Sequence, residues 1–406
     1  MLAAGALLVG ALAGVPLRAG EPPSGPTPVE RAEHRLGAVT AFADGRHVIA
    51  LLPRARPGTA TAAGEALATR HGAALEAVWT LASVEETCLV LRVADGADAR
   101  AVSERVRAEE GVVVAYPVQA FRTRDVEVDV RLASLPSALS AEPLERVQDA
   151  LRTMRVDAAS EVVSGAGARV ALIDSAVAVD HPDLADQDVE FEDFVGREVS
   201  SGESHGTALA ALIAADAANG VGMAGVAPEA SLLALRACWQ DEAGRGSCNT
   251  FSLAVALDRA VLADADVINM GLEGPPDDAL VTLVRTAQEF GAVVIAAQGG
   301  IDFPAGLPGV LSVSPSDGPR AGDDPLGDVR APGFEVLSAA PSGGYDFYTG
   351  SSIASAHASG VAALVRSGSP EADALAVGRA IEAGAADGPL DACAALAALP
   401  DGPRCP

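Results

Sequence analysis

The chain contains no lysine: all 28 of its basic residues are arginine, and 55 acidic residues outnumber them. The formal net charge of -27 at pH 7 argues against binding to nucleic acids and to anionic membrane surfaces, because both would be repelled. Aromatic residues make up only 3% of the 406 residues. Small and aliphatic side chains must therefore fill the core. The composition fits a large acidic protein that meets neutral or basic peptides.

Apolar runs of membrane-spanning length are also missing. Leu2–Val15 is apolar but too short to span a bilayer. Together with the small residues up to Gly20 it has the pattern of a signal peptide, although the usual basic start is absent. We therefore expect residues 1–20 to be a signal-like segment, the mature protein to lack a membrane helix, and the location to be secreted or periplasmic.

Cysteine is scarce, and its five residues include no pair of Cys-x-x-Cys motifs, which argues against a zinc site. Cys238 and Cys248 flank a polar, glycine-containing loop, and Cys393 and Cys405 flank a short segment near the C-terminus. Each pair can form a local disulfide in an oxidising compartment. The alternative is that all five are reduced packing residues. Cys88 is left over as a buried thiol.

The first third of the chain alternates strand and helix patterns. Strands are expected at 47–52, 75–79, 88–93 and 112–118, and helices at 59–71 and 97–110. The order strand, helix, strand, strand, helix, strand matches a ferredoxin-like split unit. We assign it residues 35–123. Residues 124–158 are interpreted as a connector with one helix at 144–156.

From Gly165 onward, apolar strands alternate with helices. Such strands indicate a parallel sheet covered by helices on both faces. Residues 159–390 are therefore expected to form an α/β domain, followed by a C-terminal tail at 391–406. The expected strands are 169–173, 232–236, 267–270, 292–296 and 310–313, and the expected helices are 205–215, 251–262, 279–290 and 352–366.

Three short motifs in this region supply a carboxylate, an imidazole and a hydroxyl. Ile173–Ser175 ends a buried strand, whereas Ser204–Thr207 and Thr349–Ala354 each begin a helix. A serine hydroxyl is a poor nucleophile and needs an adjacent base, a task that histidine performs near neutral pH. A carboxylate can fix the imidazole and stabilise its protonated form. The three motifs predict a catalytic triad of Asp174, His205 and Ser352.

In this order, the motifs resemble those of the subtilisin-like serine peptidase family over roughly residues 165–365. The strings Gly220–Pro228 and Val267–Met270 also match that family. The resemblance implies a subtilisin-like parallel sheet and hydrolysis of a polypeptide substrate through an acyl-enzyme, by a monomeric enzyme. The split unit resembles the family's propeptides. It implies a precursor in which residues 35–123 cover the cleft until cleavage near residues 124–145.

The residues that should complete the site depart from the family pattern. Gly300 stands where the family places the asparagine that binds the developing oxyanion, and glycine has no side-chain donor. The backbone amide of Ser352 is still available as a donor to the oxyanion. Gln298 is a candidate substitute donor, although its position does not match that of the family's asparagine. Loss of that donor costs roughly 10²–10³ in rate in a member of this family. The resemblance therefore implies slower catalysis than usual.

A second departure affects the substrate side. The family usually follows its Ile-Asn-Met strand with Ser-Leu-Gly-Gly, and here the string contains Glu273. That carboxylate either favours a basic peptide side chain, obstructs a bulky one, or is a solvated loop residue. The substrate-binding candidates are Gly271, Leu272, Glu273 and Gly274.

Two other functions compete with a peptidase. Gly300 and Glu273 favour a catalytically impaired protein that binds peptides. An esterase or lipase is disfavoured because Ser352 lacks the Gly-x-Ser-x-Gly context and follows the histidine. No acidic loop has convincing calcium-ligand spacing, so no metal or cofactor is predicted.

Overall fold

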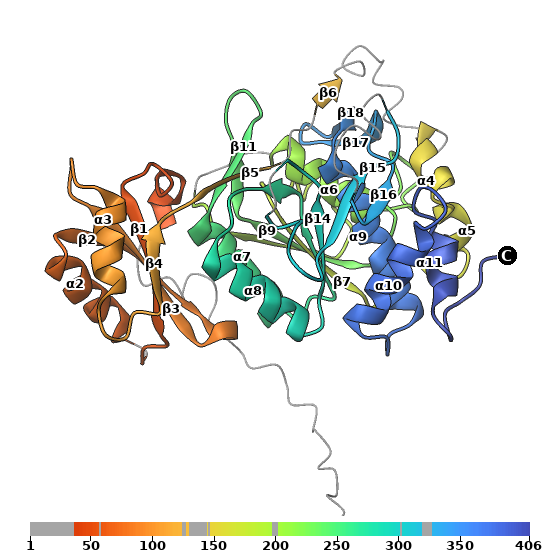
Figure 1. Ribbon diagram of the computed structural model, residues 1–406. Coiled ribbons are helices and arrows are strands. Elements are labelled where there is room, and N and C mark those ends of the chain that lie inside the picture. Colours follow the sequence, from red (N-terminus) through yellow and green to blue (C-terminus); the bar gives the residue numbers. More distant parts are fainter. Residues whose placement is uncertain are drawn as a thin grey trace, which may run out of the picture.

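The computed structural model describes residues 36–56, 58–123, 127–129, 144, 147–196, 202–300, 303–318 and 327–406. The signal-like segment 1–20 and most of the expected cleavage region 124–145 lie outside the described residues. Figure 1 shows a small domain beside a larger one that surrounds a central sheet. No helix in the described part of the chain is both long and apolar enough to cross a bilayer.

The small domain is a four-stranded antiparallel sheet with the strand order β2-β3-β1-β4 and two helices. Alternate residues of β1 point to opposite faces: Val48 and Ala50 join the core beneath the helices, whereas Ile49 and Leu51 face the larger domain. The chain order of strands and helices is that of the split unit expected from the sequence. The elements are η1 (Leu36–Ala41), β1 (His47–Pro53), α2 (Ala60–Arg70), β2 (Ala73–Leu81), η2 (Ala82–Val84), β3 (Glu86–Val93), α3 (Ala99–Arg107) and β4 (Val114–Pro117).

The larger domain is built on a seven-stranded sheet in which every adjacent pair is parallel. Its strand order is β16-β15-β14-β12-β7-β9-β8, which confirms the predicted α/β class. The strands are β7 (Arg169–Asp174), β8 (Val189–Asp193), β9 (Ser231–Arg236), β12 (Val267–Met270), β14 (Val293–Ala297), β15 (Leu311–Pro315) and β16 (Val329–Ala331).

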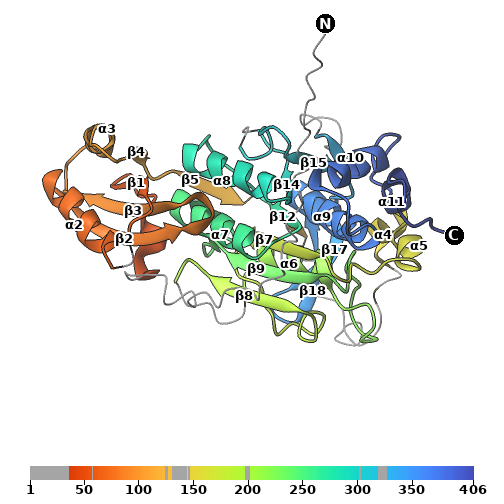
Figure 2. The ribbon, with the colours of Figure 1, turned by 90° about the horizontal axis from the view of Figure 1, so that it is seen from below.

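Helices cover both faces of this sheet (Figure 2). Along β7, Val170 and Leu172 pack with α6 (Ser204–Ala214) and α9 (Ser351–Gly368). Ala171 and Ile173 pack on the opposite face with α7 (Thr250–Leu262) and α8 (Asp278–Glu289). Because both faces are buried, the strand is apolar from Val170 to Ile173 rather than alternating, as predicted from its sequence.

Two expected segments fold differently from the prediction. The helix expected at 144–156 is instead two short helices, α4 (Asp149–Thr153) and α5 (Val156–Ser160). The expected C-terminal tail contains α11 (Ala392–Ala398), which packs on α9, α5 and α10 (Ala374–Gly384). Apolar residues such as Leu396 are buried there, so this segment is part of the domain.

A single strand leaves the small domain and enters the larger one. β5 (Ala120–Thr123) pairs antiparallel with β11 (Gly246–Asn249) on one side and with β13 (Leu272–Glu273) on the other. Further along the chain, β6 (Glu127–Asp129) pairs with β18 (Gly344–Thr349), which in turn pairs with β17 (Val336–Ala340). The same chain therefore contacts two separate parts of the larger domain within ten residues (Figure 1).

The two domains also meet through a polar and aromatic interface. Asp258, which is buried on α7, accepts hydrogen bonds from the backbone N–H and the hydroxyl of Ser83 at 2.7 and 2.6 Å. The Tyr116 hydroxyl donates to Asp277 at 2.5 Å. Burial raises the pKa of the Asp277 carboxyl. The small domain therefore satisfies polar groups that would otherwise face water.

Candidate active site

His205 lies within hydrogen-bond distance of both Asp174 and Ser352, although the three residues are far apart in the sequence. His205 Nδ1 lies 2.7 Å from Asp174 Oδ1, and His205 Nε2 lies 3.0 Å from Ser352 Oγ. A carboxylate can only accept, so Nδ1–H donates to Asp174 and Nε2 accepts from the serine hydroxyl. All three residues are buried, with exposures of 2% or less.

The secondary structure explains this convergence. Asp174 is the last residue of β7, while His205 and Ser352 lie in the first turns of α6 and α9. Parallel strands place their carboxyl ends and the following helix starts at one edge of the sheet. Close contact requires a glycine beside the histidine, because a Cβ on Gly206 would lie 2.3 Å from the Ser175 carbonyl oxygen.

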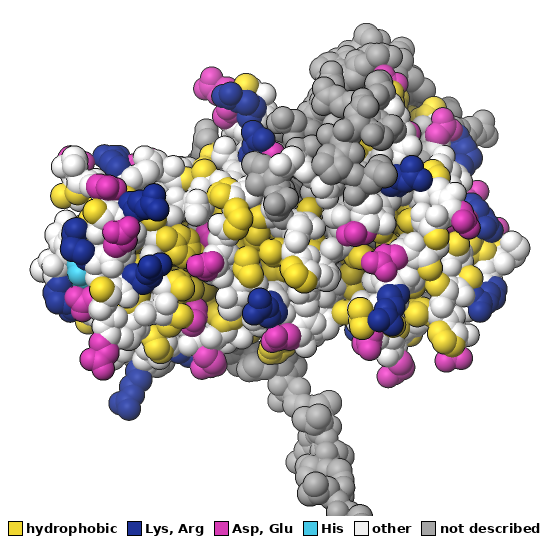
Figure 3. All heavy atoms as spheres, in the orientation of Figure 1, with side chains coloured by type: hydrophobic (Ala, Val, Ile, Leu, Met, Phe, Trp, Pro, Cys, Tyr) yellow, Lys and Arg dark blue, Asp and Glu magenta, His cyan; other side chains and the backbone are white. Residues whose placement is uncertain are grey.

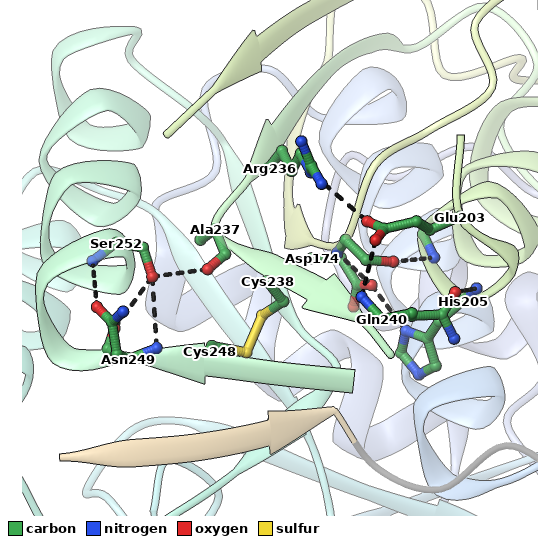
Figure 4. The surroundings of a disulfide bond; sticks show 12 residues. Asp174, Glu203, His205, Arg236, Ala237, Cys238, Gln240, Cys248, Asn249 and Ser252 are labelled. Carbon is green, nitrogen blue, oxygen red and sulfur yellow. Dashed lines mark hydrogen bonds and ion pairs between the residues drawn. A yellow bond between two sulfur atoms is a disulfide. The ribbon is translucent and has the colours of Figure 1, made fainter. Parts of the chain in front are cut away.

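A second layer of polar residues holds the start of α6. The Gln240 side-chain oxygen accepts from the Ser204 hydroxyl at 3.0 Å and from the His205 backbone N–H at 3.3 Å. Glu203 accepts from the backbone N–H of Gln240 at 2.7 Å, and buried Arg236 lies 3.5 Å from its carboxylate. Figure 4 shows this sequence of contacts leading from Arg236 to His205. It fixes the backbone that carries the imidazole.

A disulfide anchors the strand that carries Gln240. Cys238 in β10 (Cys238–Gln240) is bonded to Cys248 in β11, beside the histidine network (Figure 4). The second expected disulfide, Cys393–Cys405, is also present and ties the C-terminus to α11. Cys88 is a free, buried thiol, and burial raises its pKa.

The sequence raises the question of a side-chain donor to the oxyanion at two positions, Gly300 and Gln298. Gly300 is exposed, and a Cβ on it would have no atom within 4 Å. The Gln298 amide nitrogen lies 3.3 Å from the Gly299 carbonyl oxygen, and its side chain lines a cavity bordered by Leu375 and Arg379 of α10. Among the described residues, no hydrogen bond joins the Gln298 side chain to the Ser352 hydroxyl.

The four substrate-binding candidates line the path of β5. Leu272 pairs with Thr123, and Glu273 pairs with Arg122. The preceding residue, Gly271, approaches the triad: a Cβ on it would lie 3.2 Å from Ser352 Cβ. The strand β13, with which β5 pairs, therefore begins next to Ser352.

Glu273 is not a solvated loop carboxylate. It is 1% exposed, and its Oε1 accepts from the Arg122 guanidinium at 2.7 and 2.5 Å. Next to it, Gly274 leaves room for the Phe121 ring, since a Cβ there would lie 2.0 Å from that ring. Phe121 also packs against Phe303 with ring centroids 5.5 Å apart.

Metal ligands and a second buried histidine, His357, are the remaining features that bear on catalysis. Within the described ranges, no group of three or more His, Cys, Asp or Glu residues is arranged to hold a metal ion. His357 is a buried residue of α9, with Nδ1 2.8 Å from the Pro332 carbonyl oxygen, and burial lowers its pKa to about 4. Its contacts are those of a packing residue.

The sequence did not single out Gln240, Arg122 or Phe121. Glu203 immediately precedes the Ser-His-Gly-Thr motif, which was a usable signal, but the partners of this carboxylate are 33 to 37 residues away. Arg122 and Phe121 acquire their positions only because β5 inserts into the larger domain. No local pattern encodes that insertion.

Comparison with known proteins gives consistent matches over the larger domain. The subtilase family model matches residues 165–392, more than half of the chain. Subtilisin NAT from Bacillus subtilis subsp. natto is 36% identical over 227 residues, covering 52% of this chain and 58% of its own. Thermitase from Thermoactinomyces vulgaris is 34% identical over 220 residues, covering 51% and 77%. The chain thus spans less than two thirds of the length of subtilisin NAT.

A solved structure supports the same fold over a longer stretch. Fervidolysin from Fervidobacterium pennivorans, described as a keratinolytic enzyme related to subtilisin, superposes with a TM-score of 0.70 at 22% identity. The match covers 86% of this chain and 61% of that chain. It therefore extends beyond the region matched by the sequence comparisons.

Proposed function

Because the chain belongs to the subtilase family, we propose that it is a serine endopeptidase that cleaves peptide bonds and is made as a precursor. One observation carries the proposal: the hydrogen-bonded series Asp174, His205, Ser352 lies beside Gly271, which precedes β13, and the extended strand β5 pairs with β13 and β11. Nucleophile, base and bound peptide are thus adjacent.

The proposed reaction uses these groups in a fixed order. His205 Nε2 removes the proton from Ser352 Oγ, which attacks the peptide carbonyl carbon. His205 then gives that proton to the leaving amine, and an acyl-enzyme remains for water to hydrolyse. Asp174 keeps the imidazole in the productive tautomer and stabilises its positive charge. The Ser352 backbone N–H donates a hydrogen bond to the developing oxyanion.

The precursor assignment is supported by β5 and β6. The two strands pair with different parts of the larger domain: β5 pairs with β13, which follows Gly271, and β6 pairs with β18, which ends at Thr349. Residues 124–126 join the two strands in the sequence. Those three residues lie at the start of the cleavage region 124–145 expected from the sequence. We therefore place self-cleavage in the link between β5 and β6, with residues 35–123 acting first as a folding aid and then as an inhibitor.

A fluorophosphonate probe, combined with mass spectrometry, tests this function. We expect the processed chain to be labelled on Ser352 and to hydrolyse peptides, whereas Ser352→Ala stays intact and unlabelled. The new N-terminus of the wild-type chain should fall within residues 124–127. Wild-type protein that remains as intact as Ser352→Ala contradicts self-processing.

The Tyr116–Asp277 hydrogen bond gives a separate test of the inhibitory role. Tyr116→Phe removes the hydroxyl that donates to a largely buried carboxylate, and a hydrogen bond to a charged group contributes roughly 1.5–3 kcal/mol. We expect the small domain to inhibit the processed enzyme about 10- to 100-fold less tightly. Peptide hydrolysis measured over a range of protein concentrations reports the release.

Asp95→Asn is the control for that variant. Asp95 is exposed on the small domain and pairs with Arg46, away from the interface. It should leave inhibition unchanged. Equal inhibition by Tyr116→Phe and wild type would show that the interface does not hold the inhibitor in place.

Gly300 favours a second candidate function, a peptide-binding protein with impaired catalysis. Without a side-chain donor at that position, the tetrahedral intermediate loses one stabilising hydrogen bond. Absence of probe labelling in a chain that still binds peptides would favour this candidate over the peptidase.

We further propose that the protein acts outside the cytoplasm, in a secreted or periplasmic location. The two disulfides support this proposal, because such bonds persist in oxidising compartments.

A further inference from the structure

We propose that Glu273 makes the mature enzyme select substrates that carry a basic residue at the position occupied by Arg122 in β5. This inference rests on the proposed peptidase function and names the substrate class for the same site. It concerns the side chain three residues before the cleaved bond, counted on its amino side.

The strand register defines that position. Thr123 pairs with Leu272, and Arg122 pairs with Glu273, in an antiparallel ladder. The residue before Leu272 is Gly271, whose Cβ position lies 3.2 Å from Ser352 Cβ. In a peptide bound in this register, the residue opposite Gly271 therefore presents its carbonyl to the serine. The residue opposite Glu273 comes two residues earlier.

Arg122 and Glu273 form a hydrogen-bonded ion pair between the small domain and the larger one. Both Nε and Nη2 of Arg122 donate to Glu273 Oε1, at 2.7 and 2.5 Å. The Glu273 side chain is 1% exposed, whereas the Arg122 side chain is 60% exposed. The carboxylate is therefore buried on the larger domain, and the guanidinium reaches it from the surface. Of the two charges, only the carboxylate stays with the enzyme once the small domain leaves.

A carboxylate held at the floor of a cleft discriminates strongly between peptides. When a peptide covers it, the charge loses water, and a cation must replace that water for binding to be favourable. An arginine in the substrate supplies the cation. A neutral side chain of the same size does not supply the charge of the guanidinium, and an acidic one adds repulsion.

The two neighbours of Arg122 in β5 make uncharged contacts. Phe121, the neighbour on the amino side, fits an apolar space formed by Gly274 and Phe303. Thr123, the neighbour on the other side, lies against Gly246, where a Cβ would come within 1.9 Å of its hydroxyl. Among Phe121, Arg122 and Thr123, it is therefore Arg122 that makes the charged contact with the larger domain.

Internally quenched peptides test this inference with the processed enzyme. They carry residues 119–127 of this chain, Gln-Ala-Phe-Arg-Thr-Arg-Asp-Val-Glu, with arginine, citrulline or glutamate at the place of Arg122. Citrulline keeps the size and shape of arginine but has no charge. We expect kcat/KM to fall about 10- to 100-fold from arginine to citrulline, and further for glutamate.

Variants of the enzyme complete the test. Glu273→Gln should hydrolyse the arginine and citrulline peptides at similar rates, and Glu273→Arg should prefer the glutamate peptide. Asp278→Asn is the matched control, because it removes one exposed carboxylate from the nearby start of α8 without touching the cleft. It should keep the wild-type preference.

The outcomes separate this inference from the function on which it rests. Peptide hydrolysis with equal rates for arginine and citrulline overturns the role of Glu273 and leaves the peptidase intact. Labelling of Ser352 without hydrolysis of the arginine peptide also overturns it, because that peptide is the predicted substrate. No hydrolysis and no labelling overturns the proposed function, and the inference falls with it.

Discussion

Asp174→Asn is expected to lower kcat by about 10⁴-fold with little change in KM, the size seen when the same change is made in another Ser-His-Asp enzyme. Asp174 Oδ1 accepts from His205 Nδ1 and from the Ser175 backbone N–H, at 2.7 and 2.6 Å. An asparagine amide that donates to Nδ1 would hold the proton on Nε2. His205 could then no longer accept the serine proton.

Steady-state kinetics and probe labelling measure this effect together. The Asn variant should fold like wild type, react slowly with the fluorophosphonate, and remain largely unprocessed. The control is Asp266→Asn: Asp266 lies at the opposite edge of the sheet and accepts from the Arg169 backbone N–H and from the Arg366 guanidinium. A fall in kcat of similar size in both variants would mean that the loss reflects stability rather than the triad.

Gly300→Asn is expected to raise kcat, by up to about 10²–10³-fold, which is the loss recorded when this donor is removed from a member of the family. Among the described residues, a Cβ on Gly300 has no atom within 4 Å, and the backbone there does not require the positive φ reserved for glycine. An asparagine amide would add a second donor for the oxyanion beside the Ser352 backbone N–H.

Gly300→Ala is the control that distinguishes the effect of the hydrogen-bond donor from the effect of side-chain volume. Alanine fills part of the same space but donates nothing, so it should leave kcat at the wild-type value. If asparagine and alanine give the same kcat, the missing donor does not limit the rate of this enzyme.

The sequence was informative wherever a local pattern determines the structure. The apolar strand ending at Asp174 and the helix starts at His205 and Ser352 could be predicted because strands and helices are local, and parallel sheets bring their ends together. The boundaries were less certain: the short helices α4 and α5 and the packed helix α11 differ from the predicted helix and tail. Tertiary packing, rather than local periodicity, fixes those ends.

The contacts of the residues around the triad could not be predicted as fully as the triad itself. Glu273 had three competing interpretations, because its environment depends on a strand that comes 151 residues earlier in the chain. The same holds for Gln240, which supports His205 from a disulfide-bonded hairpin. Each contact joins segments distant in sequence, and only the assembled fold shows which side chains meet.

The insertion of β5 also has a kinetic consequence. If the proposed self-cleavage takes place while β5 and β6 belong to one chain, the effective concentration of that peptide bond does not depend on how much protein is present. Self-cleavage should therefore be a first-order process, equally fast in dilute and concentrated solution. After the cut, the small domain is a separate molecule. Its rebinding becomes bimolecular, so dilution alone shifts the population toward the open, active form.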